Sequence, residues 1–446
     1  MRTDLRLALL LTRGSDRREW WRVTLTVVGA GLATGFGLAA VAVASLDGQY
    51  DLSFANGLLD QPGERSGVVL ALLLLLVPVL GFLGQSARIG AVHRDRRLAG
   101  LRLAGASPAQ VRRIAALETG LACLVGSAVV TVFCVLFLLD AWRRPPAAVW
   151  VGFALIAVAV PVLGALVSAL ALRRVIASPL GWVRRVRPTG VRGPGLAFLL
   201  ATLVILITGV ALAPRSFGGF ATAPLLVFTV VILTGVGAVR LSGAGARFTG
   251  RYLAARTGNP ATLIAAERLR DDPWAAARTH AAVLLVTVVG TGFMGIRQVL
   301  LDDLNGRDHG MFAENMSFYT TGIDLTGAAI LVALAITLSS LAVGTAESLA
   351  TRRRGLAAQV AAGVPQAVLG RALLMETALP LAPAVALAGV GGMGIGAWYG
   401  QLAAGGSIPL LPAIVPVIVY AACLLAAATS LPLLRRSVNP AELRYV

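Results

Sequence analysis

The chain has 446 residues, of which 57% are hydrophobic and only 13% are charged. This composition excludes a soluble globular protein, because no soluble core could bury so many long apolar runs, and it predicts a polytopic membrane protein. The net charge of +18 comes from Arg alone, since the sequence has no Lys. These Arg are spread along the chain, so we expect attraction to anionic lipid and no nucleic-acid binding.

Ten apolar runs are long enough to cross a hydrocarbon layer of about 30 Å at about 1.5 Å per residue. We therefore expect an all-α polytopic membrane protein with ten transmembrane helices. The expected spans are residues 23–46, 67–87, 119–139, 147–172, 195–213, 221–239, 279–296, 325–346, 377–399 and 408–434.

Arginine marks one side of these expected spans. Counting alternate flanks from the N-terminus places 33 of the 39 basic residues on one side. Because Arg is retained on the cytoplasmic side during insertion, we expect both termini to be cytoplasmic. The two sizeable loops on the other side, residues 47–66 and 302–324, carry more acidic residues than Arg.

One segment of the sequence occurs twice. Residues 93–119 and 351–377 align without gaps at a constant offset of 258, and ten positions are identical. Gly105 and Gly363 form one of the identical pairs. Each copy lies between two expected spans, so the sequence predicts an Arg-rich cytoplasmic loop that the chain presents twice.

The repeated loops belong to larger repeated halves. We expect a first four-span half at residues 1–192, a two-span connector at 193–245 and a second four-span half at 246–446. Because the connector adds an even number of crossings, both halves run in the same direction, as parallel repeats do. Near the start of the second half, Asn259 followed by Pro260 is typical of a helix N-terminus.

Local signals in the first copy predict a bend between two helices. A helix that continues the second span is expected to end at Gly105, and Ser107 followed by Pro108 suits a new helix start. We expect the new helix to be short, residues 109–117, and to lie across the membrane surface. It ends where Glu118 begins the third span.

The second copy repeats this pattern with Gly363, Pro365 and Arg371. In both copies we expect the Arg of the short helix, Arg113 or Arg371, to orient that helix against the acid that follows it or against lipid phosphate. The residues expected to couple the loops to a cytosolic subunit are Arg102, Gly105, Ser107, Pro108, Gln110, Val111, Arg112, Arg113, Gly363, Pro365, Gln366, Leu369 and Arg371, with Glu118 and Glu376 as the acids at the start of the next spans.

The expected spans hold no recognisable reaction chemistry. None of them contains Asp, Glu, Arg or Lys, which a gradient-driven transporter normally uses near mid-membrane. The three Cys are expected to be unpaired packing residues, and no catalytic motif or metal-ligand spacing is present. We therefore expect no catalytic site and no metal in this chain. We also expect no ATPase activity, because a phosphate-binding P-loop needs a Lys.

The first copy reads Leu101-Arg102-Leu103-Ala104-Gly105-Ala106-Ser107, followed by Gln110, Arg113 and Glu118. This pattern resembles the FtsX-like, MacB-type permeases of ABC transporters. Members typically show a basic stretch, a Leu-Arg-Ala-Leu-Gly-Ala-like turn, a helix with Gln or Arg, and a Glu that opens the next span. The resemblance covers nearly the whole chain, twice, and the ten-span layout is similar to that of the bacitracin-exporter branch.

The resemblance implies a permease subunit in the bacterial plasma membrane with no ATPase site of its own. It implies that a separate cytosolic ABC ATPase, in two copies, docks on the two loops. That partner would hold ATP and Mg²⁺, and this chain would need no cofactor.

The sequence departs from that family at two places. Many relatives have a Glu shortly before the Leu-Arg-Ala stretch, where this chain has Arg97 and Gly355, so a salt bridge to the ATPase from that position is not carried over. The bacitracin-exporter branch has a large extracellular domain between spans seven and eight, whereas residues 302–324 form only a short loop. Substrate capture by such a domain is not carried over either.

We therefore expect the membrane subunit of a bacterial ABC exporter or mechanotransmission complex. Its substrate is expected to be apolar or amphipathic, because the spans offer no charged site. The alternative is a non-transporting regulator of the same fold that passes force to an extracellular partner such as a cell-wall hydrolase. A gradient-driven transporter or a membrane enzyme is a third interpretation.

Overall fold

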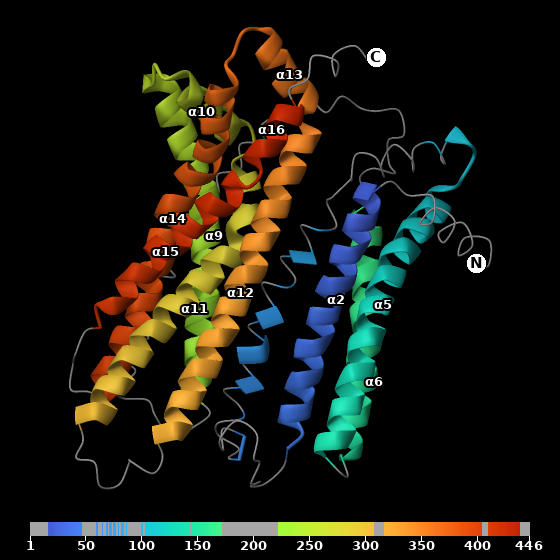
Figure 1. Cartoon of the computed structure of the whole chain (residues 1–446), viewed down its shortest axis with the longest axis vertical. Coiled ribbons are helices and arrows are strands. Elements are labelled where there is room, and N and C mark those ends of the chain that lie inside the picture. The colour runs from blue at the N-terminus through green and yellow to red at the C-terminus, as the bar shows by residue number, and fades with distance from the viewer. Residues whose placement is uncertain are drawn as a thin grey trace. The chain divides into compact units, whose positions relative to one another are not determined.

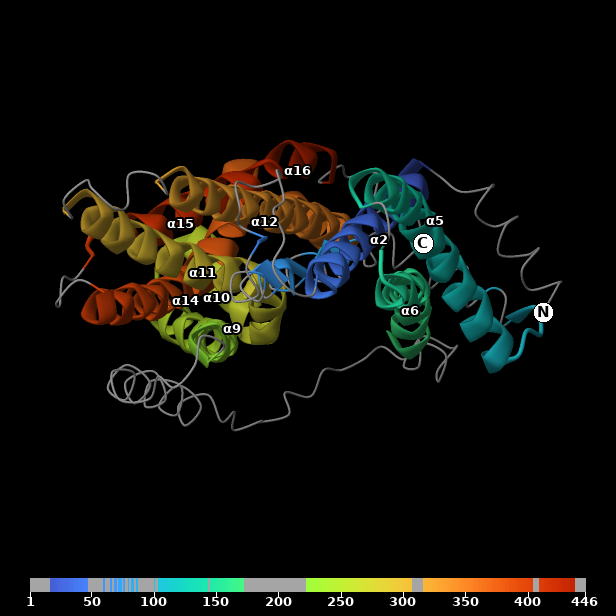
Figure 2. The same cartoon turned by 90° about the horizontal axis from the view of Figure 1, so that it is seen from below.

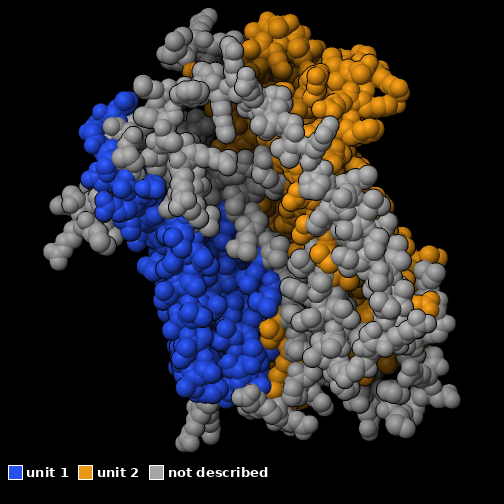
Figure 3. Space-filling view, turned by 180° about the vertical axis from the view of Figure 1, so that it is seen from behind, with its two compact units in different colours: residues 1–48, 71–187 blue, residues 49–70, 188–446 orange. Residues whose placement is uncertain are grey.

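The computed structural model describes residues 17–46, 103–142, 145–171, 222–306, 316–403 and 409–437, together with scattered positions between 59 and 100. Every regular element named within these residues is a helix. The chain divides into two compact units, coloured in Figure 3: Met1–Gly48 with Ala71–Arg187, and Gln49–Leu70 with Pro188–Val446. We call them unit 1 and unit 2 and describe each by itself.

Unit 1 is built on three long helices, α2 (Arg17–Ala44), α5 (Pro108–Ala141) and α6 (Ala147–Ala171), each packed against the other two (Figure 1). The backbones of α2 and α5 meet at Gly126, where an added Cβ would overlap the carbonyl oxygen of Val27. Small residues at such crossings let membrane helices approach closely. The two helices therefore form one tightly joined pair.

Unit 2 contains the other described helices. They are α9 (Thr222–Arg256), α10 (Pro260–Asp271), α11 (Pro273–Gly306), α12 (Met316–Thr351), α13 (Arg353–Ala361), α14 (Gln366–Ala403), the 3₁₀ turn η4 (Leu411–Ala413), α15 (Ile414–Ala428) and α16 (Leu431–Ser437). The most extensive packing is between α11 and α14, and α9 lies against both (Figure 2). The helices α10, α13 and α16 lie at one end of the unit, which we call the Gly363 end (Figure 1).

Glycine also allows the central helix pair of unit 2 to touch. A Cβ on Gly295 of α11 would lie 2.7 Å from the Cα of Gly396 on α14, and a Cβ on Gly392 would lie 2.7 Å from the carbonyl oxygen of Val288. No larger residue fits at these points without moving the helices apart. The pairs α2–α5 and α11–α14 thus use the same packing device within their own units.

Seven candidate membrane spans occur among the described residues: Trp20–Ala44, Ala109–Asp140, Ala147–Leu166, Thr279–Asp302, Tyr319–Thr351, Gln366–Gln401 and Leu411–Leu434. They correspond to expected spans one, three, four and seven to ten. The chain is therefore an all-α polytopic membrane protein, as the composition predicts.

The other three expected spans leave the number ten a prediction. The structure describes about half of the span at 67–87, at scattered helical positions, and none of the span at 195–213. The span at 221–239 corresponds to the first half of α9. The domain boundaries at residues 192 and 245 also stay predictions, although α9 runs through residue 245 as a single helix.

The predicted helix start in the second half is confirmed. The side chain of Asn259 accepts a hydrogen bond from the N–H of Ala261 at 3.0 Å, and Pro260 is the first residue of α10. An Asn cap suits this position because its side chain accepts a hydrogen bond from a backbone N–H that has no partner within the helix. Pro suits the next position because it has no N–H to satisfy. The cap fixes where α10 begins at the Gly363 end of unit 2.

Candidate functional site

The first glycine turn, residues 103–110, separates two helices of unit 1. The N–H of Ala104 donates to the carbonyl oxygen of Gly100 at 2.9 Å, which completes a last helical turn. Gly105 then adopts φ +94°, a conformation that residues with a Cβ disfavour. The predicted stop at Gly105 is confirmed.

A capping box starts the helix that follows the first glycine turn. Ser107 Oγ accepts from the N–H of Gln110 at 3.2 Å, and Gln110 Oε1 accepts from the N–H of Ser107 at 2.8 Å. Pro108 occupies the first helical position, where no N–H donor is needed. The predicted start at Ser107 and Pro108 is confirmed, and it satisfies two backbone donors at an exposed helix end.

The second glycine turn, residues 361–368, ends α13 with a Schellman motif. The N–H of Gly363 donates to the carbonyl oxygen of Val360 at 2.9 Å, and the N–H of Val364 donates to that of Gln359 at 3.0 Å. Gly363 adopts φ +91°. This pair of hydrogen bonds needs a residue with positive φ between them, which explains the glycine.

Glycine is required in both turns by the backbone and not by crowding. Gly105 and Gly363 are exposed, and a Cβ added to either would meet nothing within 4 Å. A side chain there would have room but would hold the backbone in a region that costs roughly 1–2 kcal/mol for other residues. The two turns therefore share one conformation for one physical reason.

The prediction of a separate short helix after each glycine is wrong. Helix α5 runs without a break from Pro108 to Ala141, and α14 runs from Gln366 to Ala403. At Glu118 the sequence changes from polar to apolar while the helix continues. No bend is needed there, because a straight helix can extend out of the apolar layer. The ten residues before Glu118 extend α5 by about 15 Å beyond that carboxylate.

Glu118 lies buried on α5 in unit 1. Its Oε1 accepts a hydrogen bond from Nη2 of Arg22, which is in the second turn of α2. The side chain of Glu118 is 3% exposed and that of Arg22 is 6% exposed. Such a buried charge needs its partner, so this ion pair fixes the start of α2 against α5.

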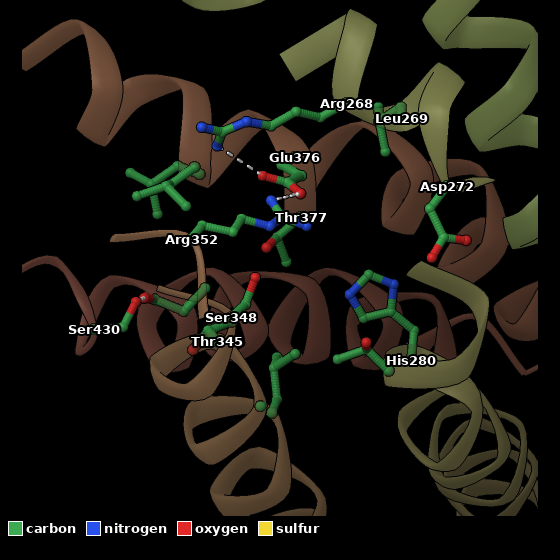
Figure 4. Close-up of a pocket in the computed structure, with 16 residues that line it drawn as sticks. Arg268, Leu269, Asp272, His280, Thr345, Ser348, Arg352, Glu376, Thr377 and Ser430 are labelled. Carbon is green, nitrogen blue, oxygen red and sulfur yellow. Dashed lines mark hydrogen bonds and ion pairs between the residues drawn. The ribbon is translucent and has the colours of Figure 1, made fainter. Parts of the chain in front are cut away.

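Glu376 is the equivalent acid on α14, and two arginines of unit 2 bind it (Figure 4). Arg268 Nη1 of α10 lies 3.2 Å from Oε2, and Arg352 Nη1 lies 2.6 Å from Oε1. Arg268 Nη2 is also 3.5 Å from Oε1 of Gln359 on α13. One carboxylate thus ties α14 to α10 and to the junction between α12 and α13.

Residues 68–180 match the FtsX-like permease C-terminal domain. The chain carries an FtsX-like permease domain. The matched range includes the first glycine turn and Glu118, whereas the second glycine turn lies outside it. No curated protein matches the chain.

This FtsX-like domain supports a membrane permease of an ABC-type system. FtsX-like permeases are non-enzymatic transporter subunits that normally work with a cytosolic ABC ATPase. The likeness to the MacB-type and bacitracin-exporter branches stays a prediction.

Arg371 does not bind Glu376 as predicted, whereas the alternative that Arg113 and Arg371 face lipid phosphate stays a prediction. Arg371 is exposed on α14, and the arginines that reach Glu376 are Arg268 and Arg352 instead. In unit 1, Arg113 is exposed on α5, and Arg22 of α2 binds Glu118. The helical spacing explains this for Arg371, because residues five apart point to different sides of a helix.

The other predicted coupling residues divide into anchors and surface positions. Val111 and Leu369 occupy equivalent places, and both are fully buried. Leu369 packs with Leu349 and Leu356, which fastens the second glycine turn to unit 2. Three of the others are exposed: Gln110, Pro365 and Gln366. Arg112 is half-buried, and Arg102 lies outside the described residues.

A cavity of about 100 Å³ lies beside the Glu376 cluster at the Gly363 end (Figure 4). Arg268, Arg352 and Glu376 line one side, and His280 lines another. His280 is 2% exposed, and its Nδ1 has no hydrogen-bond partner among the described residues. The lining holds cationic and anionic groups together, so its charge favours neither sign.

Sequence reasoning missed the three arginines that bind the acids. Arg352 belongs to the repeated segment and is identical there with Arg94, and this identity could have indicated that Arg352 has a role in the turn. Arg22 and Arg268 have no counterpart in the repeated segment. Their separations from their acids, 96 and 108 residues, left nothing local to indicate the pairing.

Proposed function

We propose that the chain is the membrane subunit of a bacterial ABC exporter or mechanotransmission complex, and that each glycine turn receives one copy of a separate cytosolic ATPase. The observation that supports this most is the shared conformation of Gly105 and Gly363 at exposed helix junctions. Each glycine directly precedes a helix that continues as a candidate membrane span. An ATPase that moved the turn would therefore move the span.

The continuous helices support direct transmission of movement. In α5 and α14, backbone hydrogen bonds run from the turn into the apolar segment with no intervening loop. A helix of this kind transmits displacement along its axis because its local geometry is fixed. We infer that the first ten residues of each helix act as a lever and not as a hinged arm.

The two ion-pair clusters extend this proposal to neighbouring helices. A displacement of α5 would pull α2 through Glu118 and Arg22. A displacement of α14 would pull α10 through Arg268 and the start of α13 through Arg352. Each turn would then move a group of helices within its own unit.

The orientation and the nucleotide belong to the same proposal. The Arg-rich flanks support cytoplasmic termini and a cytoplasmic position for both turns in the plasma membrane. The partner ATPase would bind ATP and Mg²⁺, because a P-loop needs the Lys that this sequence lacks. The uncharged expected spans support an apolar or amphipathic substrate.

Stoichiometry tests the proposal. The full chain is purified from its native membranes, and native mass spectrometry counts the bound ATPase subunits. We expect two ATPase copies for each permease chain, because each chain offers two turns. A complex with one copy per chain would contradict independent docking at both turns, and a co-purified cell-wall hydrolase would favour the regulator over the exporter.

A further inference from the structure

The second half of α9 is basic and continues beyond the apolar part of that helix. Residues 240–256 contain four Arg and no acid, whereas residues 222–239 contain no charged residue. The guanidinium of Arg240 lies 5.9 Å from the ring centre of Trp274, at the start of α11. Trp and Arg favour the level of the lipid headgroups, so this pair and the expected span at residues 221–239 predict where α9 leaves the membrane.

Helix α10 holds the projecting half of α9 in place. The two helices are joined by residues 257–259 and pack along each other at the Gly363 end (Figure 1). A Cβ on Gly250 would lie 2.8 Å from the carbonyl oxygen of Ala266, so the two backbones touch. One face of the projecting half is therefore fully occupied by unit 2.

The opposite face carries an ordered row of exposed side chains. Phe248 is 71% exposed and Tyr252 is 47% exposed, and their rings are stacked with centroids 6.1 Å apart. The guanidinium of Arg256 lies 4.5 Å from the Tyr252 ring centre, and its Nη1 donates to the Tyr252 hydroxyl at 2.6 Å. Exposed Arg251 completes the set of four residues, which we call the α9 strip.

The α9 strip has the composition and order of a protein-binding surface. Tyr and Arg are enriched among the residues that dominate binding energy at interfaces. Stacking already restricts the Phe248, Tyr252 and Arg256 side chains, so a partner would lose little free energy in ordering them. The large exposed ring of Phe248 provides an apolar surface at one end of the strip, beside the arginines.

The strip stands too far from the lipid to be a membrane anchor. Phe248 is eight residues beyond Arg240 and Arg256 is sixteen, which is about 12 Å and about 24 Å along the helix axis. The headgroup layer adds only about 5–7 Å to each side of the hydrocarbon. Since α9 packs along the candidate spans α11 and α14, its axis follows theirs out of the membrane.

We propose that the α9 strip is a docking surface for an acidic protein partner. The partner surface would place Asp or Glu side chains against Arg251 and Arg256 and an apolar side chain against Phe248 and Tyr252. Arg251 and Arg256, both exposed in a segment that contains no acid, supply the charge complementarity. This surface is separate from the glycine turns, so it goes beyond the proposed function.

Photo-crosslinking of the full chain in living cells tests this surface. Benzoylphenylalanine replaces Phe248 in one variant and Phe133 in a matched control, since Phe133 is 69% exposed but lies within the candidate span Ala109–Asp140. We expect the probe at position 248 to give a protein adduct whose crosslinked peptide contains Asp or Glu. The probe at position 133 should give lipid adducts only.

Charge reversal separates specific docking from general attraction. The double variant Arg251→Glu with Arg256→Glu should lower the adduct yield about tenfold. Arg270→Glu, an exposed position on neighbouring α10, should leave the yield unchanged. The proposal is overturned if the probe at position 248 gives no adduct, a lipid adduct, or an adduct only within the chain or to a second copy of it. It is also overturned if Arg270→Glu lowers the yield of the protein adduct as much as the double variant does.

Discussion

The carboxylates Glu118 and Glu376 occupy equivalent places in the two repeated segments but bind their arginines differently. Glu118 is almost fully buried and pairs with Arg22 from the start of α2. Glu376 is 20% exposed and is shared by Arg268 and Arg352 beside a cavity. The repeat thus preserves the acid and the glycine turn, while the helices that the acid binds differ between the units.

This difference suggests different mechanical roles for the two acids. The charges of Arg22 and Glu118 are almost fully buried and cannot regain water when they separate, so this pair fixes α2 against α5. A shared and partly hydrated carboxylate allows one arginine to leave while the other stays bound. We infer that unit 2 permits more relative movement near its glycine turn than unit 1 does.

Removing the charge of Glu118 should have the largest effect on stability. Glu118→Gln leaves the Arg22 cation buried without an anion, so we expect a loss of about 3–5 kcal/mol in the free energy of unfolding. Denaturant unfolding of the full chain in detergent, followed by Trp fluorescence, measures this. The double variant Arg22→Met with Glu118→Leu should recover most of the loss, and an unchanged Glu118→Gln variant would contradict the buried pair.

Removing the charge of Glu376 should have a smaller effect. Glu376→Gln should cost about 1–2 kcal/mol, because Arg268 and Arg352 are partly exposed and regain water. The same unfolding assay gives the comparison with Glu118→Gln. If Glu376→Gln is the more damaging substitution, the inferred difference between the units is wrong.

Alanine at the glycine turns should separate backbone conformation from crowding. Gly363→Ala should cost roughly 1–2 kcal/mol because of its positive φ. Gly355 on α13 also has nothing within 4 Å of an added Cβ but has no positive φ, so Gly355→Ala should instead stabilise by about 0.5–1 kcal/mol. Equal effects at the two positions would show that the turn does not need positive φ.

The helix cap of the first glycine turn should contribute least. Ser107→Ala should cost about 1 kcal/mol, because the N–H of Gln110 loses its side-chain acceptor. Ser107→Asp keeps an acceptor and should retain wild-type stability. A loss in Ser107→Asp equal to that in Ser107→Ala would mean that the capping box does not stabilise α5.

Local features of the fold and the turns could be predicted from the sequence, because short-range chemistry fixes them. Gly105 and Gly363 adopt positive φ as their places at helix ends indicate, and Ser107 and Asn259 cap helices where Pro follows. The apolar runs that coincide with candidate spans were also predictable from length and composition. Each of these depends on a few neighbouring residues.

The continuity of α5 and the partners of the acids could not be predicted in the same way. The sequence around Glu118 changes from polar to apolar, and this change resembles a helix boundary although the backbone does not bend there. Arg22 and Arg268 reach their acids only through helix packing. Packing depends on small residues such as Gly126, whose role becomes visible only when the opposing helix is in place.

The most direct test of the account is ATP hydrolysis by the ATPase that co-purifies with the chain, measured with Gly105→Val and Gly363→Val variants. Val disfavours positive φ more strongly than Ala, so each variant should misdirect its turn while the spans still insert. Gly100→Val and Gly355→Val are the controls, because both positions have room for a side chain and no positive φ. The account predicts that each turn variant alone loses permease-stimulated hydrolysis while the controls keep it. If both turn variants insert normally and retain full stimulation, the glycine turns do not couple the ATPase to the membrane helices.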